Sequence, residues 1–169
     1  RQYVYAARDR HDEAYDRVRA VRDERYKYLR HYHPEQPYLS WIPYRNRHPV
    51  MAAMWRAYLE GTLTWEQQLL FATPRPVEEL YDTEADPFEM INLAADVEFQ
   101  PILERLRQAL SRWQADVGDL GDIAEEEMLR RWWPDGVQPV TAAVSFVPIA
   151  AAAAGLELLS GGLPGELPG

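Results

Sequence analysis

Apolar and polar residues alternate along the first part of the chain, a pattern that predicts β-strands. The expected strands span residues 2–7, 18–21 and 26–32. Asp23 and Glu24 separate the last two, so these should form a hairpin. The alternation divides the third strand between two faces: Tyr26, Tyr28, Arg30 and Tyr32 share one, and Lys27, Leu29 and His31 share the other.

Helical periodicity replaces this alternation further along. A long amphipathic helix is expected over residues 101–117, with one apolar stripe that packs against the core: Leu103, Leu106, Leu110, Trp113 and Val117. Shorter helices are expected over residues 50–59, which Gly61 would stop, and over residues 123–133. Thr64, with Gln67 three positions later, predicts the capped start of another short helix.

The sequence also predicts the structure of the connecting segments. Residues 33–48 are rich in proline and aromatic residues, which predicts an ordered loop, and the charged residues 8–13 predict another loop. Leu80 and Tyr81 should add a strand, and Asp86 should cap a short helix that ends near Asn92. The predicted fold class is therefore α+β: a small antiparallel sheet of about four strands packed with a long C-terminal helix and shorter helices.

Three short motifs follow one another within this part of the sequence. They are Glu79-Leu-Tyr-Asp82, Asp86-Pro-x-Glu89 and Asn92-Leu-Ala. Together they resemble the E-L-Y-D…D-P-x-E…N-L-A pattern near the C-terminus of type I sulfatases, in the arylsulfatase and heparan N-sulfatase-like branch of the alkaline phosphatase-like superfamily. Residues 18–22 and 25–29 resemble the paired strands that precede this pattern. The resemblance implies a sulfatase C-terminal subdomain over residues 1–139, followed by a low-complexity tail over 140–169 that we expect to be truncated or disordered.

The chemistry of a sulfatase is not expected in this chain. The family uses a formylglycine, made from Cys or Ser in a C/S-x-P-x-R motif, and a divalent metal, usually calcium. The chain has no cysteine, and Ser40, Pro43 and Arg45 miss the motif spacing by one residue. The Asp-Asp and Asp-Asn pairs of the family's metal site have no match either. We therefore expect no catalytic or metal-binding residues here, with formylglycine and calcium in a missing N-terminal sulfatase domain, and a fragment that is inactive alone.

Charge is unevenly distributed along the chain. Residues 1–50 hold 11 Lys and Arg against 7 Asp and Glu, whereas the whole chain has a net charge of −9. A basic segment in an acidic protein suits a small anionic ligand better than nucleic acid, although a basic strand pair packed against acidic helices explains it equally well. Residues 142–156 are uncharged but too short to span a membrane, and Pro148 interrupts them.

The segment 8–13 is the predicted substrate-binding site. Arg8 and Arg10 offer planar forks for sulfate or carboxylate oxygens, His11 can donate a hydrogen bond, and Glu13 can accept one from a hydroxyl or amine. Heparan N-sulfatase-like members carry a comparable His-x-Glu loop, so the resemblance also implies substrate contacts by His11 and Glu13. A solvated charged loop is the alternative. A metal site built from His31 and His33 together with His11 and Glu13 is less favoured than isolated surface histidines.

The predicted function is that of the C-terminal portion of a sulfatase that hydrolyses sulfate esters or sulfamates of a sulfated saccharide. In this interpretation the chain completes the fold and contributes substrate contacts. The family implies a periplasmic or secreted protein. Two alternatives remain: a non-catalytic binding or assembly module, and an independent enzyme that uses His11 and Glu13 as acid and base.

Overall fold

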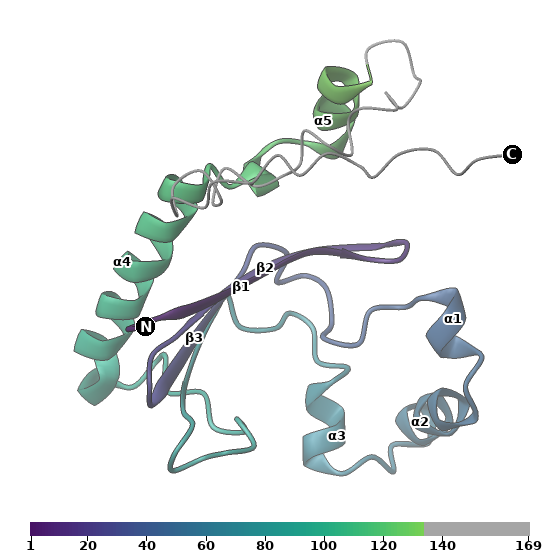
Figure 1. Cartoon of the computed structure of the whole chain (residues 1–169). Helices are drawn as coiled ribbons and strands as arrows, with labels where there is room; N and C mark the ends of the chain where they lie inside the picture. Colours follow the sequence, from purple (N-terminus) through teal and green to yellow (C-terminus); the bar gives the residue numbers. More distant parts are fainter. Residues whose placement is uncertain (134–169) are drawn as a thin grey trace, which may run out of the picture. The chain divides into compact units, whose positions relative to one another are not determined.

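The computed structural model describes residues 1–133 of the 169-residue chain. The chain divides into two compact units, Arg1–Asp116 and Val117–Gly169. The first unit contains a four-stranded antiparallel sheet in the order β1-β2-β3-β4 (Figure 1). The strands are β1 (Val4–His11), β2 (Ala14–Arg22), β3 (Tyr26–His31) and β4 (Glu78–Asp82). The α+β fold class and the sheet of four strands predicted from the sequence are confirmed.

The hairpin between β2 and β3 forms where the sequence predicts it, with a turn one residue longer than expected. The side chain of Asp23 holds this turn, because its Oδ1 accepts hydrogen bonds from the backbone N–H groups of Arg25 at 2.9 Å and Tyr26 at 2.6 Å. In the strand pairs that follow, Val21 lies opposite Tyr28, and Tyr28 lies opposite Leu80. These three residues therefore share one face of the sheet.

Helix α4 (Gln100–Val117) covers this face, which we call the closed face. The sheet and the helix together form one core of buried side chains: Val21, Tyr28, Leu80, Leu103, Leu106, Ala109 and Leu110. Trp113 packs at the margin, where its ring stacks on Tyr5 with centroids 5.0 Å apart. The predicted apolar stripe is confirmed except at its last member, because Val117 is 37% exposed.

The opposite face of the sheet, which we call the open face, lies on the side of a long excursion between β3 and β4 (Figure 1). The excursion carries α1 (Pro43–Asn46), α2 (Pro49–Glu60) and α3 (Trp65–Leu69). Gly61 ends α2 with φ 67°, in the left-handed region that glycine adopts without strain, and Thr64 and Gln67 form the predicted capping box of α3. The short helix α1 interrupts the loop expected over residues 33–48.

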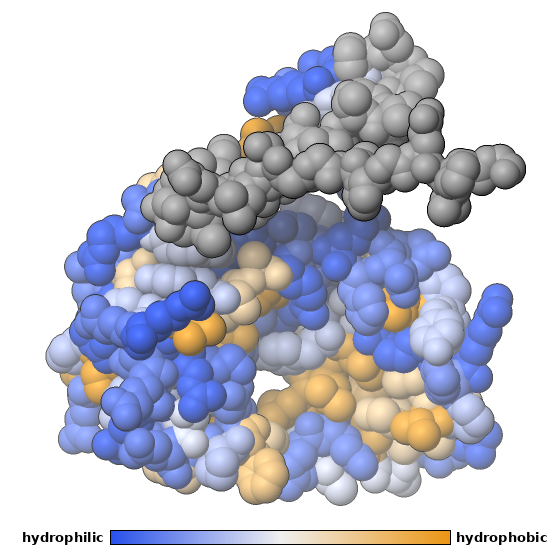
Figure 2. All heavy atoms as spheres, viewed as in Figure 1, coloured by the Kyte–Doolittle hydropathy of each residue, from blue (hydrophilic) through white to orange (hydrophobic). Residues whose placement is uncertain are grey.

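Apolar side chains gather on the outer surface of the excursion (Figure 2). The most exposed of them are large: Trp41, Tyr44, Val50, Leu59 and Trp65. Exposed large apolar groups of this kind suit contact with another protein surface.

The connection between β4 and α4 differs from the prediction. No helix begins at Asp86. Instead its Oδ2 accepts hydrogen bonds from the backbone N–H groups of Met90 at 2.6 Å and Ile91 at 2.8 Å, and Glu89 has a positive φ of 55°. Asn92 does not end a helix either: its Oδ1 accepts from Leu80 N at 3.0 Å, which fixes this segment to the edge of β4. Asp86 and Asn92, which were predicted to cap a helix, thus stabilise a turn and a sheet edge instead.

The described part of the second unit holds the 3-10 helix η2 (Leu120–Asp122) and α5 (Glu125–Trp132). The helix predicted over residues 123–133 is therefore confirmed. The predicted boundary after residue 139 and the predicted tail lie outside the described residues. Within residues 1–133, every helix is too short or too polar to cross a membrane.

Candidate functional site

The predicted loop over residues 8–13 is a strand and a tight turn. Strand β1 continues through His11, and only Asp12 and Glu13 lie outside the strands of the hairpin. Asp12 has a positive φ of 50°, a conformation that Asp adopts more readily than most residues. Charged residues are tolerated in this strand because β1 is the edge of the sheet and most of its residues are exposed. The prediction of a loop over residues 8–13 was therefore wrong for residues 8–11.

A β-bulge changes the direction of side chains in this hairpin. Arg8 pairs with Val18, but Arg10 pairs with Tyr15, so two residues of β2 oppose a single residue of β1. The two residues, Asp16 and Arg17, are both buried, which strict alternation would not allow on a sheet with one covered face. Asp16 contacts Arg8, whereas the guanidinium of Arg17 lies 3.9 Å from the ring centre of Tyr32.

The four predicted substrate-binding residues are divided by this geometry. Arg8 and His11 line the same small hollow, together with Tyr38 and Arg45 from the excursion. Arg10 instead reaches around the turn, where its Nη1 donates to the carbonyl oxygen of Glu13 at 3.3 Å, and its guanidinium approaches the Tyr15 ring. Glu13 is exposed in the turn itself. The structure brings Arg8 and His11 together and places Arg10 and Glu13 at the hairpin tip.

A larger hollow of about 330 Å³ adjoins the small one on the open face. Both hollows include Arg8 and Tyr38 in their walls. The floor consists of small and aliphatic side chains: Ala6, Val18, Ala20 and Leu29. Apart from Ala7, the other lining side chains are basic or aromatic: Arg8, Lys27, His31, Tyr38 and Arg75. An apolar floor with a few polar groups around it is the usual composition of a small-molecule site.

Two buried carboxylates organise the charges beside this hollow. Asp16 accepts hydrogen bonds from both Arg8 and Arg75, so one carboxylate holds two guanidinium groups. Glu79 accepts from the Tyr38 hydroxyl, and one of its oxygens lies 3.2 Å from Nε2 of His31. The side chains of Asp16, Arg75, His31 and Glu79 are each at most 4% exposed. Burying four ionisable groups is costly, which favours a functional interpretation of this cluster.

Several nitrogen atoms in the cluster are left without a hydrogen-bond partner. For Arg75, Nη2 donates to Asp16 and to the carbonyl oxygen of His33, but Nε and Nη1 have no partner among the described residues. The same holds for both ring nitrogens of His31, because the geometry of the 3.2 Å approach to Glu79 is not that of a hydrogen bond. An unsatisfied buried donor costs about 1–3 kcal/mol, so each such atom calls for an explanation.

Sequence reasoning found only part of this site. The period-two alternation of β3 placed Lys27, Leu29 and His31 on one face, which the structure confirms. It gave no indication of Tyr38 or Arg75, because both lie in the irregular excursion and reach the sheet only through the tertiary fold. Arg75 stands between two prolines, a context that indicates no role.

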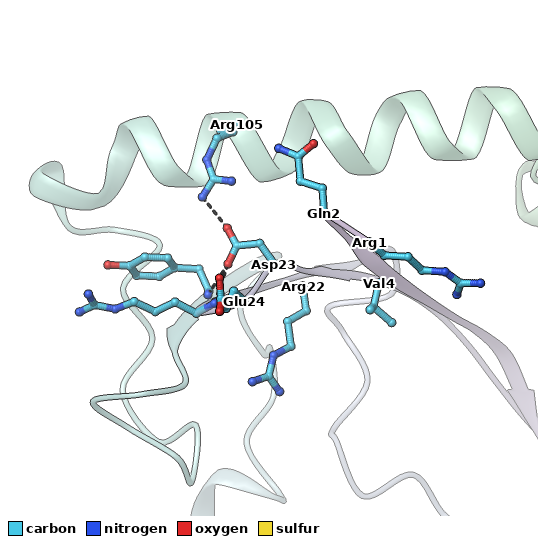
Figure 3. Close-up of a pocket in the computed structure, with 9 residues that line it drawn as sticks. Arg1, Gln2, Val4, Arg22, Asp23, Glu24 and Arg105 are labelled. Carbon is cyan, nitrogen blue, oxygen red and sulfur yellow. Dashed lines mark hydrogen bonds and ion pairs between the residues drawn. The ribbon is translucent and has the colours of Figure 1, made fainter.

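Another hollow, of about 690 Å³, lies at the turn between β2 and β3 (Figure 3). Arg105 of α4 donates to Asp23 there at 2.6 Å. Burial opposes ionisation of Asp23, but hydrogen bonds from Tyr26 and Arg105 hold its pKa below the usual value. The guanidinium groups of Arg1 and Arg22 point away from this pair and from each other. The charged groups of this hollow do not converge on a common point, so we do not regard the hollow as the functional site.

The histidines do not assemble a metal centre. His31 is buried beside Glu79, whereas His33 lies past the end of β3, with its Nδ1 3.2 Å from Glu35. Over residues 1–133, no group of three or more His, Cys, Asp or Glu side chains is arranged to hold a metal ion.

Comparisons with known proteins place this chain in a family. No family model matches the chain. The chain is 45% identical over 142 residues to an ulvan-active sulfatase of Formosa agariphila, covering 83% of this chain and 24% of that protein. It is 36% identical over 76 residues to the human N-sulphoglucosamine sulphohydrolase, covering 45% of this chain and 15% of that protein. The match to a solved structure of a 2-O GAG sulfatase covers 71% of this chain and 17% of the sulfatase chain, with 24% sequence identity and a TM-score of 0.42.

The chain thus spans about a quarter or less of the length of the curated relatives that it matches. These relatives all carry the name of a sulfatase or a sulphohydrolase. The chain belongs to the sulfatase family and matches a segment of its members.

Proposed function

We propose that this chain is the C-terminal part of a sulfatase that removes sulfate groups from a saccharide. The observation that carries the proposal is the 45% identity to an ulvan-active sulfatase over 83% of this chain. The order of the motifs from Glu79 to Asn92 supports a position near the C-terminus of the complete enzyme. The small share of each relative that is matched supports a separate, larger part that carries the catalytic centre.

The names of the relatives support a sulfated saccharide as the substrate. One relative is a sulfatase active on ulvan, and another is a sulphohydrolase of N-sulphoglucosamine. A sulfate ester is the better candidate bond, since the ulvan-active sulfatase matches at higher identity and over more of the chain. The basic residues of the open face suit such a polyanion, because guanidinium groups bind sulfate and carboxylate oxygens through paired hydrogen bonds.

The β1–β2 hairpin is the part of the chain that we assign to substrate contacts. His11 at the small hollow can donate a hydrogen bond to a sulfate or hydroxyl oxygen, and Glu13 at the turn can accept one from a sugar hydroxyl. Arg8 presents a half-exposed guanidinium that Asp16 holds in place. Arg10 braces the turn by donating to its carbonyl oxygens, so its role is to position His11 and Glu13.

The bond-breaking chemistry belongs to the part of the enzyme outside this chain. The resemblance to the family implies a formylglycine, which would supply the nucleophile, and a calcium ion, which would bind the sulfate group. The residues of this chain do not fit either group: it has no cysteine, Ser40 lies outside the required motif, and the described residues form no metal-binding cluster. We therefore assign no residue here to the catalytic step.

A chimera tests the proposal. In the ulvan-active sulfatase, the matched segment is replaced by this chain, and sulfate release from ulvan oligosaccharides is measured beside the parent enzyme and a variant that lacks the segment. We expect the chimera to retain activity within about tenfold of the parent and the deletion variant to show none. A chimera that folds, as judged by its circular dichroism and melting curve, yet is as inactive as the deletion variant would refute the proposal.

A further inference from the structure

The open-face hollow contains buried hydrogen-bond donors that its own protein environment does not use. Arg75 has a fully buried side chain, and its Nε and Nη1 have no partner among residues 1–133. The His31 side chain is 3% exposed, and neither of its ring nitrogens has a hydrogen-bond partner there, although Nε2 lies 3.2 Å from a Glu79 oxygen. Both residues line the hollow of about 330 Å³. A permanently charged guanidinium in this condition needs an acceptor from outside the described part.

We propose that this hollow is an oxyanion-binding subsite, with Arg75 and His31 as donors to a carboxylate or sulfate group of an acidic saccharide unit. The saccharide identity rests on the proposed function; the binding of an oxyanion does not. The subsite is separate from the hairpin residues assigned above, apart from Arg8, which lies in the walls of both hollows.

The lining of the hollow favours an anion over a neutral or cationic ligand. Three of its residues, Arg8, Lys27 and Arg75, are cationic, and its lining includes no carboxylate. The carboxylates that neutralise these cations, Asp16 and Glu89, contact them from outside the hollow wall. Asp16 occupies only Nη2 of Arg75, so Nε and Nη1 each keep N–H groups that can donate to an oxyanion.

The floor and the volume of the hollow fit one sugar unit. Ala6, Val18, Ala20 and Leu29 form an apolar base on the sheet, which suits the C–H face of a pyranose ring better than a free inorganic ion. Ligand sites for small molecules start at about 300 Å³, and this hollow is of that size. The unit that fits is therefore a uronate or a sulfated sugar, whose anionic group reaches Arg75 while its ring lies on the floor.

Tyr38 controls access to the unpaired donors. Its ring stands edge-on to His31 with centroids 5.7 Å apart, and the guanidinium of Arg75 lies 5.5 Å from its centre. The unpaired nitrogen atoms have almost no accessible surface, so an entering oxyanion must displace the Tyr38 side chain to reach them. Tyr38 belongs to the irregular segment between β3 and α1, where a side-chain movement disturbs no ladder of backbone hydrogen bonds.

The test is a titration of the 169-residue chain with sodium glucuronate, inorganic sulfate and neutral glucose. Nuclear magnetic resonance follows the Nε–H signal of Arg75 and the ring signals of His31. We expect both anions to shift these signals in a saturable way, with tighter binding for glucuronate because its ring covers the floor, and glucose to leave them unchanged. Two outcomes would overturn the subsite: no saturable shift with either anion, or equal shifts with glucose.

A pair of matched variants separates the subsite from general charge effects without removing the buried arginine. Ala20→Asp places a carboxylate on the floor of the hollow, whereas Ala53→Asp adds the same charge to an exposed position of α2. Ala20→Asp should weaken glucuronate binding at least tenfold, and Ala53→Asp should leave it unchanged. If both variants weakened binding equally, the anion would be bound by the net charge of the surface and the proposal would be wrong. These results do not depend on sulfatase activity, so a chimera without activity would not decide them.

Discussion

The two faces of the sheet bury side chains of different chemical character. On the closed face, seven apolar side chains from the sheet and α4 form the core, and the polar groups at its margin satisfy one another. Glu78 accepts from the Tyr28 hydroxyl at 2.5 Å and from Arg107 at 2.9 Å. On the open face, the buried groups are mainly ionisable, and donors of Arg75 and His31 remain unpaired among the described residues.

This difference indicates which face serves stability and which serves function. A satisfied apolar core stabilises the fold and gives no reason to expect a ligand. A cluster of buried charges with unused donors destabilises the isolated segment and is retained where a ligand or partner supplies the missing acceptors. We therefore expect substitutions on the closed face to change mainly the free energy of unfolding, and substitutions on the open face to change mainly binding.

The largest effect should come from the centre of the closed face. Leu106 is fully buried between α4 and the sheet, so Leu106→Ala should lower the free energy of unfolding by about 2–5 kcal/mol through lost contacts and a residual cavity. Leu29→Ala makes the same truncation at a half-buried position of the open face and should cost only about 1 kcal/mol. Urea unfolding of both variants measures the contrast, and equal losses would show that the two faces are equally important to the core.

The second effect concerns the polar margin of the closed face under acid. Hydrogen bonds from Arg107 hold the pKa of Glu78 at about 2, against an ordinary value of 4.5. Because the folded-state pKa is depressed, the stabilisation is complete above pH 4.5 and is lost as the pH falls towards 2. Glu78→Gln should therefore lower the free energy of unfolding at neutral pH by on the order of 2 kcal/mol and flatten its pH dependence between pH 4.5 and 2.

Part of that acid dependence should remain in the variant. Hydrogen bonds from Arg25 hold the pKa of Asp82 at about 2 as well, so Asp82 titrates over the same range in both proteins. Denaturant unfolding at a series of pH values gives the two profiles. Profiles of identical slope for the wild type and Glu78→Gln would exclude Glu78 as a source of acid sensitivity.

The smallest destabilisation should be confined to the excursion, which lies on the side of the open face. Thr64 caps α3 by accepting from Gln67 N, so Thr64→Ala should destabilise that helix by about 1 kcal/mol, whereas Thr64→Ser keeps the cap. Hydrogen exchange should become faster in α3 of Thr64→Ala and stay unchanged in α4. If exchange in α4 also became faster, the excursion and the closed face would unfold as one unit.

Much of the closed face could be predicted from the sequence, because periodicity reports on packing. The stripe from Leu103 to Trp113 and the alternation of β3 identified the helix, the strand and the surfaces that meet. The open face could be predicted less well. The bulge that turns Asp16 towards Arg8 depends on pairing between strands, and Arg75 and Tyr38 reach the sheet from an irregular segment without periodicity. The short polar motif at Asp86 gave a wrong prediction of a helix, because the same side chain can cap either a helix or a turn.

The hairpin variants test the central claim most directly, which is that the open side of this segment contacts the substrate of a sulfatase. His11→Ala and Glu13→Gln are introduced into the chimera with the ulvan-active sulfatase, beside the matched controls His48→Ala and Glu60→Gln at exposed positions of the excursion. Each hairpin variant should lower kcat/KM on ulvan oligosaccharides at least about tenfold, or roughly 1.4 kcal/mol of transition-state stabilisation, with little change in Tm, and the controls should leave kcat/KM unchanged. Full activity of both hairpin variants on every sulfated saccharide tested would contradict the claim and reduce the hairpin to a charged surface feature.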